Sequence, residues 1–181
     1  MNSFRANDRQ RGVALVIALV FLLLLTILGV TAMSTTSLEE KMAGNVKDRN
    51  SAFQSAEITL AAGESWVANL LDKPSFPSQS AGLYLASSTD QPVWNIIDWA
   101  SNVVIYPNNP YGSASGGLTQ VYTQPKYIIE DLGEVREKSD SLNVATDYKG
   151  KGTTSIRVTA RGTGFTDSAQ VMLQTTYARP F

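Results

Sequence analysis

The sequence predicts an α+β fold in which one long N-terminal helix packs on a small antiparallel sheet. Residues 12–38 contain no charged side chain, a run long enough to cross a membrane as a helix. Beyond it, apolar residues recur at three-, four- and seven-residue steps, the spacing of one helix face. Near the C-terminus, two stretches of alternating apolar and polar residues flank a glycine-containing turn, which predicts a β-hairpin.

The composition excludes several classes of function. The 181 residues include no His and no Cys. The first absence removes the commonest general base and transition-metal ligand, and the second removes thiol nucleophiles, zinc–thiolate sites and disulfides. The net charge of −1 gives no basic bias toward nucleic acid. No catalytic motif surrounds the serines and lysines, so we expect a protein that is not an enzyme and has no cofactor or metal.

The first 33 residues are typical of a membrane anchor. Residues 1–12 carry three Arg and one Asp, and residues 13–33 carry no charge. A helix over residues 13–33 spans the hydrocarbon core of about 30 Å, whereas the apolar part of a cleaved secretory signal is only about 7–15 residues long. The arginines favour a cytoplasmic N-terminus. The anchor interpretation is therefore favoured over a discarded signal.

The helix is expected to continue as an amphipathic segment over residues 34–73 and to stop before Pro74. A single helix from Val13 to about Asp72 would be roughly 90 Å long. Gly44 and Asn45 are expected weak points because both are poor helix formers. The expected apolar face of this segment consists of Leu38, Met42, Val46, Phe53, Ala56, Leu60, Val67, Leu70 and Leu71.

Residues 74–181 are expected to form the globular part on the periplasmic side. "KYIIEDL" predicts a short strand, and the hairpin follows it. The turn "GTGFTD" offers Gly162 and Gly164 for positive φ. The apolar face of the hairpin requires cover, which the amphipathic half of the helix supplies. The inward positions are expected to be Ile156, Val158 and Ala160 on the first strand and Ala169, Val171, Leu173 and Thr175 on the second.

The stretch "VWNIIDWASNVVIY" allows a short helix followed by a strand, or a loop plugged against the long helix. Its two tryptophans, Trp94 and Trp99, are expected to be core anchors rather than an exposed adhesive surface.

Charged side chains of the C-terminal half give only weak signals. Arg157 and Arg161 share one strand face, but two arginines are too few for a DNA or polysaccharide patch. A cluster of acids has no ordered calcium loop around it, and a solvated charged face is favoured over calcium binding. The cluster consists of Glu130, Asp131, Glu134, Glu137 and Asp140.

Two stretches resemble a known family. The segment "TTSLEEKMAGN…R…AFQSAE", behind the uncharged helix, is similar to the N-terminal half of PilX-type minor pilins of type IV pili. The ending "RVTARGTGFTDSAQVMLQTTY" resembles the last hairpin of that family. The resemblance implies the type IV pilin fold, cleavage after Gly12 by a prepilin peptidase, and N-methylation of the new N-terminus at Val13.

One position departs from the family pattern. Most type IV pilins carry Glu as the fifth residue of the mature chain, where the resemblance implies pairing with a neighbour's N-terminus. Here that position is Ile17, and no acid lies between Val13 and Glu39. A carboxylate in lipid is costly and is kept only where it finds a partner. A subunit without it suits the pilus tip, as in the tip pseudopilin of type II secretion; the alternative is that Ile17 is tolerated in a rare subunit.

The sequence therefore predicts a minor pilin that primes assembly at or near the pilus tip. Expected partners are other minor pilins, the major pilin, the prepilin peptidase and an inner-membrane assembly platform. The chain is expected to span the inner membrane once and later to reach the cell surface in the pilus. A type II secretion pseudopilin and a pilus-tip adhesin remain alternatives, and a single-pass envelope enzyme is disfavoured by the missing His and Cys.

Overall fold

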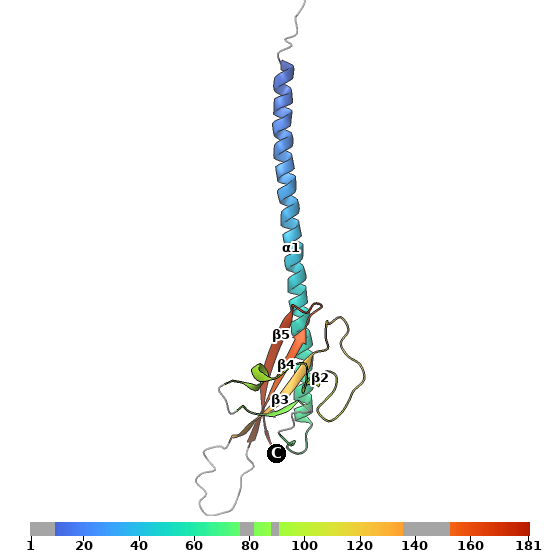
Figure 1. Cartoon of the computed structure of the whole chain (residues 1–181), viewed down its shortest axis with the longest axis vertical. Helices are drawn as coiled ribbons and strands as arrows, with labels where there is room; N and C mark the ends of the chain where they lie inside the picture. Colours follow the sequence, from blue (N-terminus) through green and yellow to red (C-terminus); the bar gives the residue numbers. More distant parts are fainter. Residues whose placement is uncertain (1–9, 77–81, 88–90, 136–152) are drawn as a thin grey trace, which may run out of the picture. The chain divides into compact units, whose positions relative to one another are not determined.

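The computed structural model describes residues 10–76, 82–87, 91–135 and 153–181 (Figure 1). Two compact units divide at Asn45 and Val46. We call residues 12–45 the stem and residues 46–181 the head. The elements in chain order are α1 (Gln10–Ala68), β1 (Leu83–Leu85), α2 (Val93–Ile96), β2 (Val104–Ile105), β3 (Lys126–Val135), β4 (Thr153–Thr163) and β5 (Gln170–Pro180).

The stem is entirely helical. Gly44 and Asn45, the expected weak points, lie inside α1 without a break. The cost of about 1 kcal/mol for a helical glycine is offset because good helix formers flank it on both sides. The prediction of one continuous helix through both residues is confirmed, although α1 begins at Gln10 and ends at Ala68 rather than near Asp72.

The head contains a five-stranded sheet in the order β1-β3-β4-β5, with β2 also paired to β3. The predicted hairpin is confirmed as β4 and β5, whose register pairs Val158 with Thr175. The α+β fold is confirmed, but the sheet is mixed because β1 runs parallel to β3. The long connection from β1 to β3 makes this possible, since parallel strands cannot be joined by a short turn.

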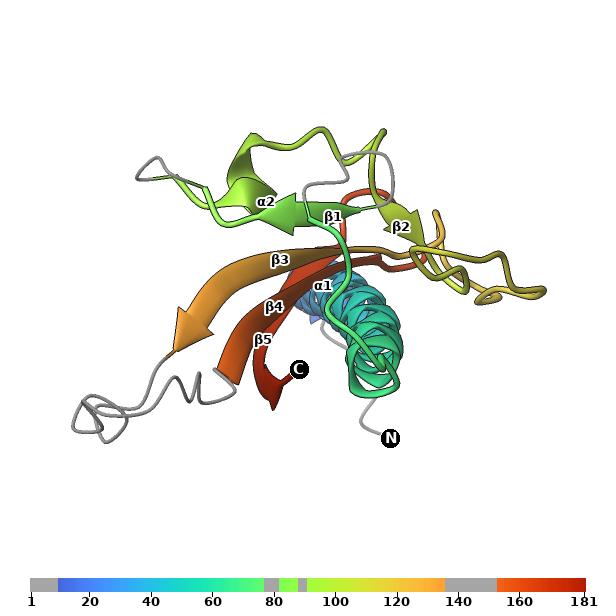
Figure 2. The ribbon, with the colours of Figure 1, turned by 90° about the horizontal axis from the view of Figure 1, so that it is seen from below.

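Helix α1 packs on one face of β3, β4 and β5, and the segment with α2 and β2 covers the other side (Figure 2). The predicted inward residues Ile156, Val158 and Ala160 are fully buried. On β5 the predicted alternation is weaker, because its inward positions are only half-buried. The core cluster consists of Val67, Leu83, Val104, Tyr127, Ile129, Ile156, Val158 and Ala160.

The buried face of α1 is made of small residues rather than large apolar ones. Ala56 and Val67 from the expected face are buried, but Leu38, Met42, Val46 and Phe53 are exposed, and Leu71 beyond the helix end is 92% exposed. The face that does pack on the sheet consists of Ala52, Ser55, Ala56, Thr59, Gly63 and Val67. Leu60, also from the expected face, is half-buried and packs against the core cluster. Phe53 was assigned wrongly because the helix lies too close to the sheet there to admit a large side chain, and Leu38 and Met42 belong to the stem rather than to the head.

Gly162 explains this close approach. A Cβ on Gly162 would overlap Ser55 Oγ and backbone atoms of Ala52 and Ala56. A Cβ on Gly164 would likewise overlap side-chain and backbone atoms of Asp48. The expectation of positive φ at Gly162 and Gly164 is wrong: in the described segments, positive-φ glycines lie elsewhere, at Gly82, Gly116 and Gly133. Because Gly162 and Gly164 have no side chain, residues of α1 occupy the space next to them.

The expected core role of two tryptophans is also wrong. Trp94 and Trp99 are half-buried and lie outside the core cluster, whereas Trp66 packs against it. The stretch around them does form a short helix, α2, followed by a strand, β2. Trp99 lies between α2 and β2, in the segment that covers the sheet on the side opposite α1 (Figure 2), and its ring centre is 5.6 Å from the Arg161 guanidinium.

Gly162→Ala should destabilise the head strongly. Overpacking costs about 1–3 kcal/mol and more where backbone must move, so we expect a loss near or above the upper value. Urea unfolding of the full chain in detergent, followed by tryptophan fluorescence, measures it because all three Trp lie in the head. Gly44→Ala, where an added Cβ meets nothing within 4 Å, is the matched control. Equal midpoints for the two variants would contradict the close contact.

Candidate functional site

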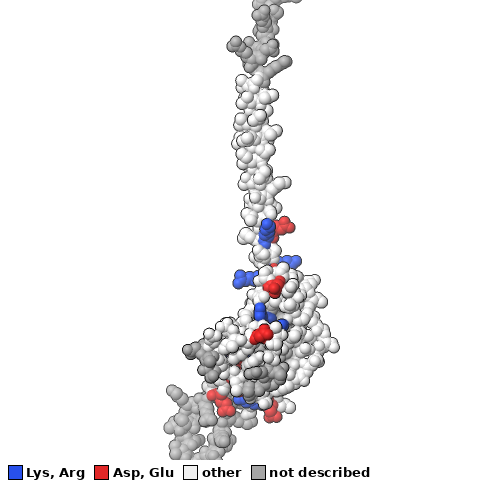
Figure 3. All heavy atoms as spheres, viewed as in Figure 1, with Lys and Arg blue, Asp and Glu red and all other residues white. Residues whose placement is uncertain are grey.

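Residues 12–38 of the stem present an uncharged, largely apolar surface on all sides. Every side chain of residues 12–45 is exposed, and the first charged residue is Glu39. Figure 3 shows the helix free of blue and red spheres on the visible face until that region. In the part of the chain that the structure describes, α1 is the one helix long and apolar enough to cross a membrane, by length and composition. Such a surface is suited to lipid or to the helices of other subunits.

The threonine hydroxyls of the stem are satisfied within the helix. Thr26 Oγ1 donates to Leu23 O at 2.8 Å, and Thr31 Oγ1 donates to Ile27 O at 2.9 Å. Thr35 and Thr36 donate to carbonyls four residues earlier in the same way. Because each donor is paired inside the helix, none of these four hydroxyls requires water.

The three predicted processing and assembly positions lie on the first turns of α1. Val13 is 61% exposed and Ile17 is 51% exposed, and the two share one helix face at a four-residue spacing. An added Cβ on Gly12 would meet nothing within 4 Å. The peptide bond between Gly12 and Val13 therefore lies within the helix, which begins at Gln10.

Asp48 anchors the β4–β5 turn to α1. Its Oδ1 accepts hydrogen bonds from Phe165 N at 2.6 Å and Thr166 N at 3.2 Å, and Thr166 Oγ1 donates to Oδ2. Lys47 Nζ lies 5.6 Å from the centre of the Phe165 ring. The Thr166 hydroxyl, followed by the two amides, holds the pKa of Asp48 below its usual value. Sequence reasoning missed this contact because Phe165 and Thr166 lie 117 and 118 residues after Asp48 in the chain.

Arg179 satisfies the C-terminal end of α1. Its Nη1 donates to Val67 O at 2.9 Å and to Ala68 O at 2.6 Å, and its guanidinium lies 5.4 Å from the Phe181 ring centre. The last carbonyls of a helix have no partner within it and carry partial negative charge. The positive charge of Arg179, near the end of β5, therefore stabilises the carbonyl end of α1.

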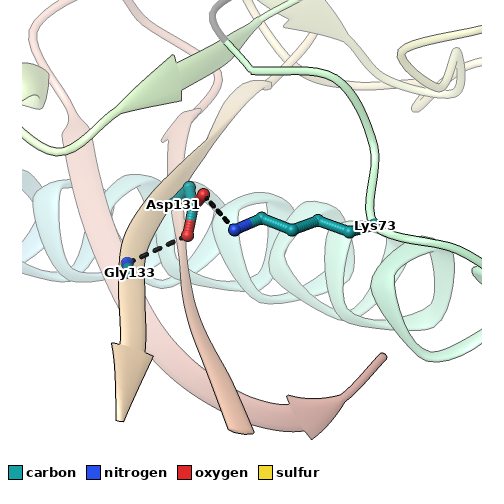
Figure 4. Close-up of polar contacts among 3 residues, drawn as sticks. All are labelled: Lys73, Asp131 and Gly133. Atoms are coloured by element: carbon teal, nitrogen blue, oxygen red, sulfur yellow. Dashed lines mark hydrogen bonds and ion pairs between the residues drawn. The ribbon is translucent and has the colours of Figure 1, made fainter. Parts of the chain in front are cut away.

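Asp131 is buried, so the expectation of a solvated acidic face is wrong at this residue. Asp131 is 6% exposed, and its Oδ2 forms an ion pair with Lys73 Nζ at 2.8 Å (Figure 4). Its Oδ1 also accepts a hydrogen bond from Gly133 N at 2.9 Å, where φ is +94° and the register shifts. Local charge patterning missed this because Lys73 lies far away in sequence.

Glu130 is the more deeply buried of the two acids. It is 1% exposed, with Arg157 Nη1 at 3.9 Å, and its Oε2 has no hydrogen-bond partner. Burial raises the pKa of Glu130, and the neighbouring Arg157 only partly opposes that rise. Glu134 is exposed, while Glu137 and Asp140 lie outside the described residues. Within the described ranges, no three His, Cys, Asp or Glu side chains gather as a metal site.

Two family models match the chain. The PilX N-terminal model matches residues 11–61, and the model for the C-terminal part of type IV pilus assembly protein PilX matches residues 47–179. Together with the long apolar helix and the α+β head, these matches define the class of protein as a type IV pilus assembly component. The chain belongs to the PilX family. No curated protein and no solved structure matches it.

Glu130→Gln should alter how stability depends on pH. A pKa raised in the folded state means that Glu130 contributes full stability below its unfolded pKa near 4.5, and loses that contribution as pH rises through the folded value. The variant should therefore gain stability relative to the wild type between pH 4 and neutral pH. Urea unfolding at several pH values measures this, with exposed Glu134→Gln as the control. A difference that stays constant with pH would contradict the buried charge.

Proposed function

We propose that the protein is a minor pilin, processed at the inner membrane and then packed into a type IV pilus. The family match supports a pilus assembly role. The observation that carries the proposal is the uncharged surface of residues 12–38, exposed on every side and with its four threonine hydroxyls paired. Such a surface needs an apolar environment, which the bilayer provides before assembly and other subunits' helices provide afterwards.

The charge distribution supports one orientation in the membrane. The three arginines of residues 1–12 favour a cytoplasmic N-terminus, so the head lies in the periplasm. Moving the stem from lipid into a bundle of helices exchanges one apolar environment for another. Little burial is gained, so extrusion depends on the assembly platform and on contacts with other minor pilins and the major pilin.

Processing takes place between Gly12 and Val13. Cleavage by a prepilin peptidase removes all three leader arginines, which lowers the cost of extracting the helix from the bilayer. Methylation of Val13 follows on the new N-terminus. The open surroundings of Gly12 support access by a peptidase, because, apart from its own neighbours along the helix, no atom of the described residues lies within 4 Å of the place where a Cβ on Gly12 would stand.

Gly12→Val should block processing. A branched side chain beside the scissile bond hinders its entry into the peptidase, so the precursor should persist with residues 1–12 attached. Immunoblots of cell membranes measure the difference in size between precursor and mature chain. Gly29→Val, at a second open position of the same helix, is the control and should be processed normally. Full-length wild-type chain in cells that contain the peptidase would contradict the proposal.

The absence of Glu at Ile17 supports a position at the tip. If the carboxylate of an incoming subunit docks it beneath the one already in place, a subunit without that carboxylate is suited to be first. This subunit would then prime assembly rather than extend the filament. A type II secretion pseudopilin shares the same stem, but the matched family is described as a pilus assembly protein.

Ile17→Glu should displace the subunit from the tip and reduce the number of pili, because the new carboxylate allows docking beneath other subunits and costs free energy in lipid where it has no partner. Immunogold electron microscopy locates the subunit, and pilus counts report priming. Ile17→Val is the control, since it keeps an apolar side chain. Unchanged tip labelling and piliation in Ile17→Glu would contradict the role assigned to this position.

A further inference from the structure

A cavity of about 470 Å³ opens on the head between strand ends and loops. The residues that line it include Lys126 on β3, Arg161 on β4 and Trp99. Side chains alternate along a strand, so Arg161 projects from the face opposite Ala160, which packs toward α1. The volume lies within the range of small-molecule sites.

Lys126 and Arg161 form a like-charge pair. The register of β3 and β4 places them directly opposite each other, and like charges at opposed positions destabilise a sheet. Among the described residues, neither side chain makes an ion pair; the two ion pairs there join Lys73 to Asp131 and Arg157 to Glu130. Two half-buried cations thus lie side by side with no carboxylate within ion-pair distance of either. Hydrogen bonds from Ala100 and Ser101, together with the charge of Lys126, hold the pKa of the nearby Asp98 below its usual value.

Both cations are held in position by neighbouring groups. Lys126 Nζ donates to Trp99 O at 2.7 Å, and Arg161 Nη2 donates to Gln170 Oε1. The Arg161 guanidinium lies 5.6 Å from the Trp99 ring centre, and Trp99 Nε1 donates to Trp94 O at 3.0 Å. Lysine has three donors and arginine five, so donors remain on both side chains for a ligand.

Two carboxylates at the same cavity restrict the kind of anion that fits. Asp98 and Asp167 belong to its lining, so the two cations are matched by two acids. Asp98 accepts hydrogen bonds from Ala100 N and Ser101 Oγ, and its carboxylate keeps further acceptor capacity. A highly charged anion is repelled by these acids. A ligand with one carboxylate and several hydroxyl donors satisfies the cations and the acids together.

We propose that this cavity binds an acidic sugar of the uronate type. The carboxylate lies between Lys126 and Arg161, the sugar hydroxyls donate to Asp98 and Asp167, and the ring packs beside Trp99. The site gives the head a means of attaching to acidic polysaccharide. It is independent of cleavage at Gly12 and of a position at the tip, so its failure would leave the proposed assembly role intact.

The test uses the full chain in detergent micelles and titrates it with digalacturonate by isothermal calorimetry. We expect binding that weakens as salt is added, and no binding of digalacturonate dimethyl ester, which keeps the ring but removes the charge. Lys126→Gln and Arg161→Gln should each weaken binding by about tenfold or more, because a charge-assisted contact is lost. Exposed Arg49→Gln, on α1, should leave binding unchanged.

Several results would overturn the site. These are absence of digalacturonate binding, equal binding of the dimethyl ester, or equal affinity in the cavity variants and in Arg49→Gln. Tighter binding of inorganic phosphate than of digalacturonate would overturn the sugar assignment. Because the ester comparison uses the unaltered chain, the proposal stays falsifiable even where a variant fails to fold. Urea midpoints for each variant show whether weaker binding reflects the site or the fold.

Discussion

The contact between helix α1 and strand β4 at Gly162 is the constraint on which the head depends. The space where a Cβ would stand is already taken by Ser55 and by the backbone of Ala52 and Ala56. The Ser55 hydroxyl also donates to Thr163 O at 3.0 Å, which adds a polar link at the same point. Because β4 lies so close to α1, the β4–β5 turn can hydrogen-bond to Asp48. Arg179, near the end of β5, can donate to the last carbonyls of α1.

The elements with a local sequence pattern were predictable from the sequence. The uncharged helix was predictable from the length of its apolar run, and the β4–β5 hairpin from the period-two alternation of its residues. The packing face of α1 was not, because apolarity alone favoured Phe53 over Ser55. The distance between helix and sheet selected small residues instead, and that distance is set by Gly162, more than 100 residues later in the chain. The same separation concealed the Asp48–Thr166 and Lys73–Asp131 contacts.

The candidate site divides in a similar way. Gly12, Val13 and Ile17 were named through the resemblance of the contiguous N-terminal stretch to type IV prepilins, and their roles stay predictions. The cavity with Lys126, Arg161 and Trp99 could not, since it draws on two strands and a loop whose register the sequence does not state. Arg161 was noted only for sharing a strand face with Arg157. In the structure Arg157 lies beside the buried Glu130, whereas Arg161 faces the cavity.

The stem and the head therefore meet different physical requirements within one chain. Residues 12–38 of the stem offer an uncharged surface whose threonine hydroxyls are paired within the helix, while the head holds Asp48, Asp131 and Arg179 in long-range contacts. The most direct test of a processed, incorporated subunit is mass spectrometry of filaments sheared from cells. The predicted result is an N-methylated peptide that begins at Val13 and ends at Lys41. Intact chain that begins at Met1 and stays in the inner membrane would contradict it.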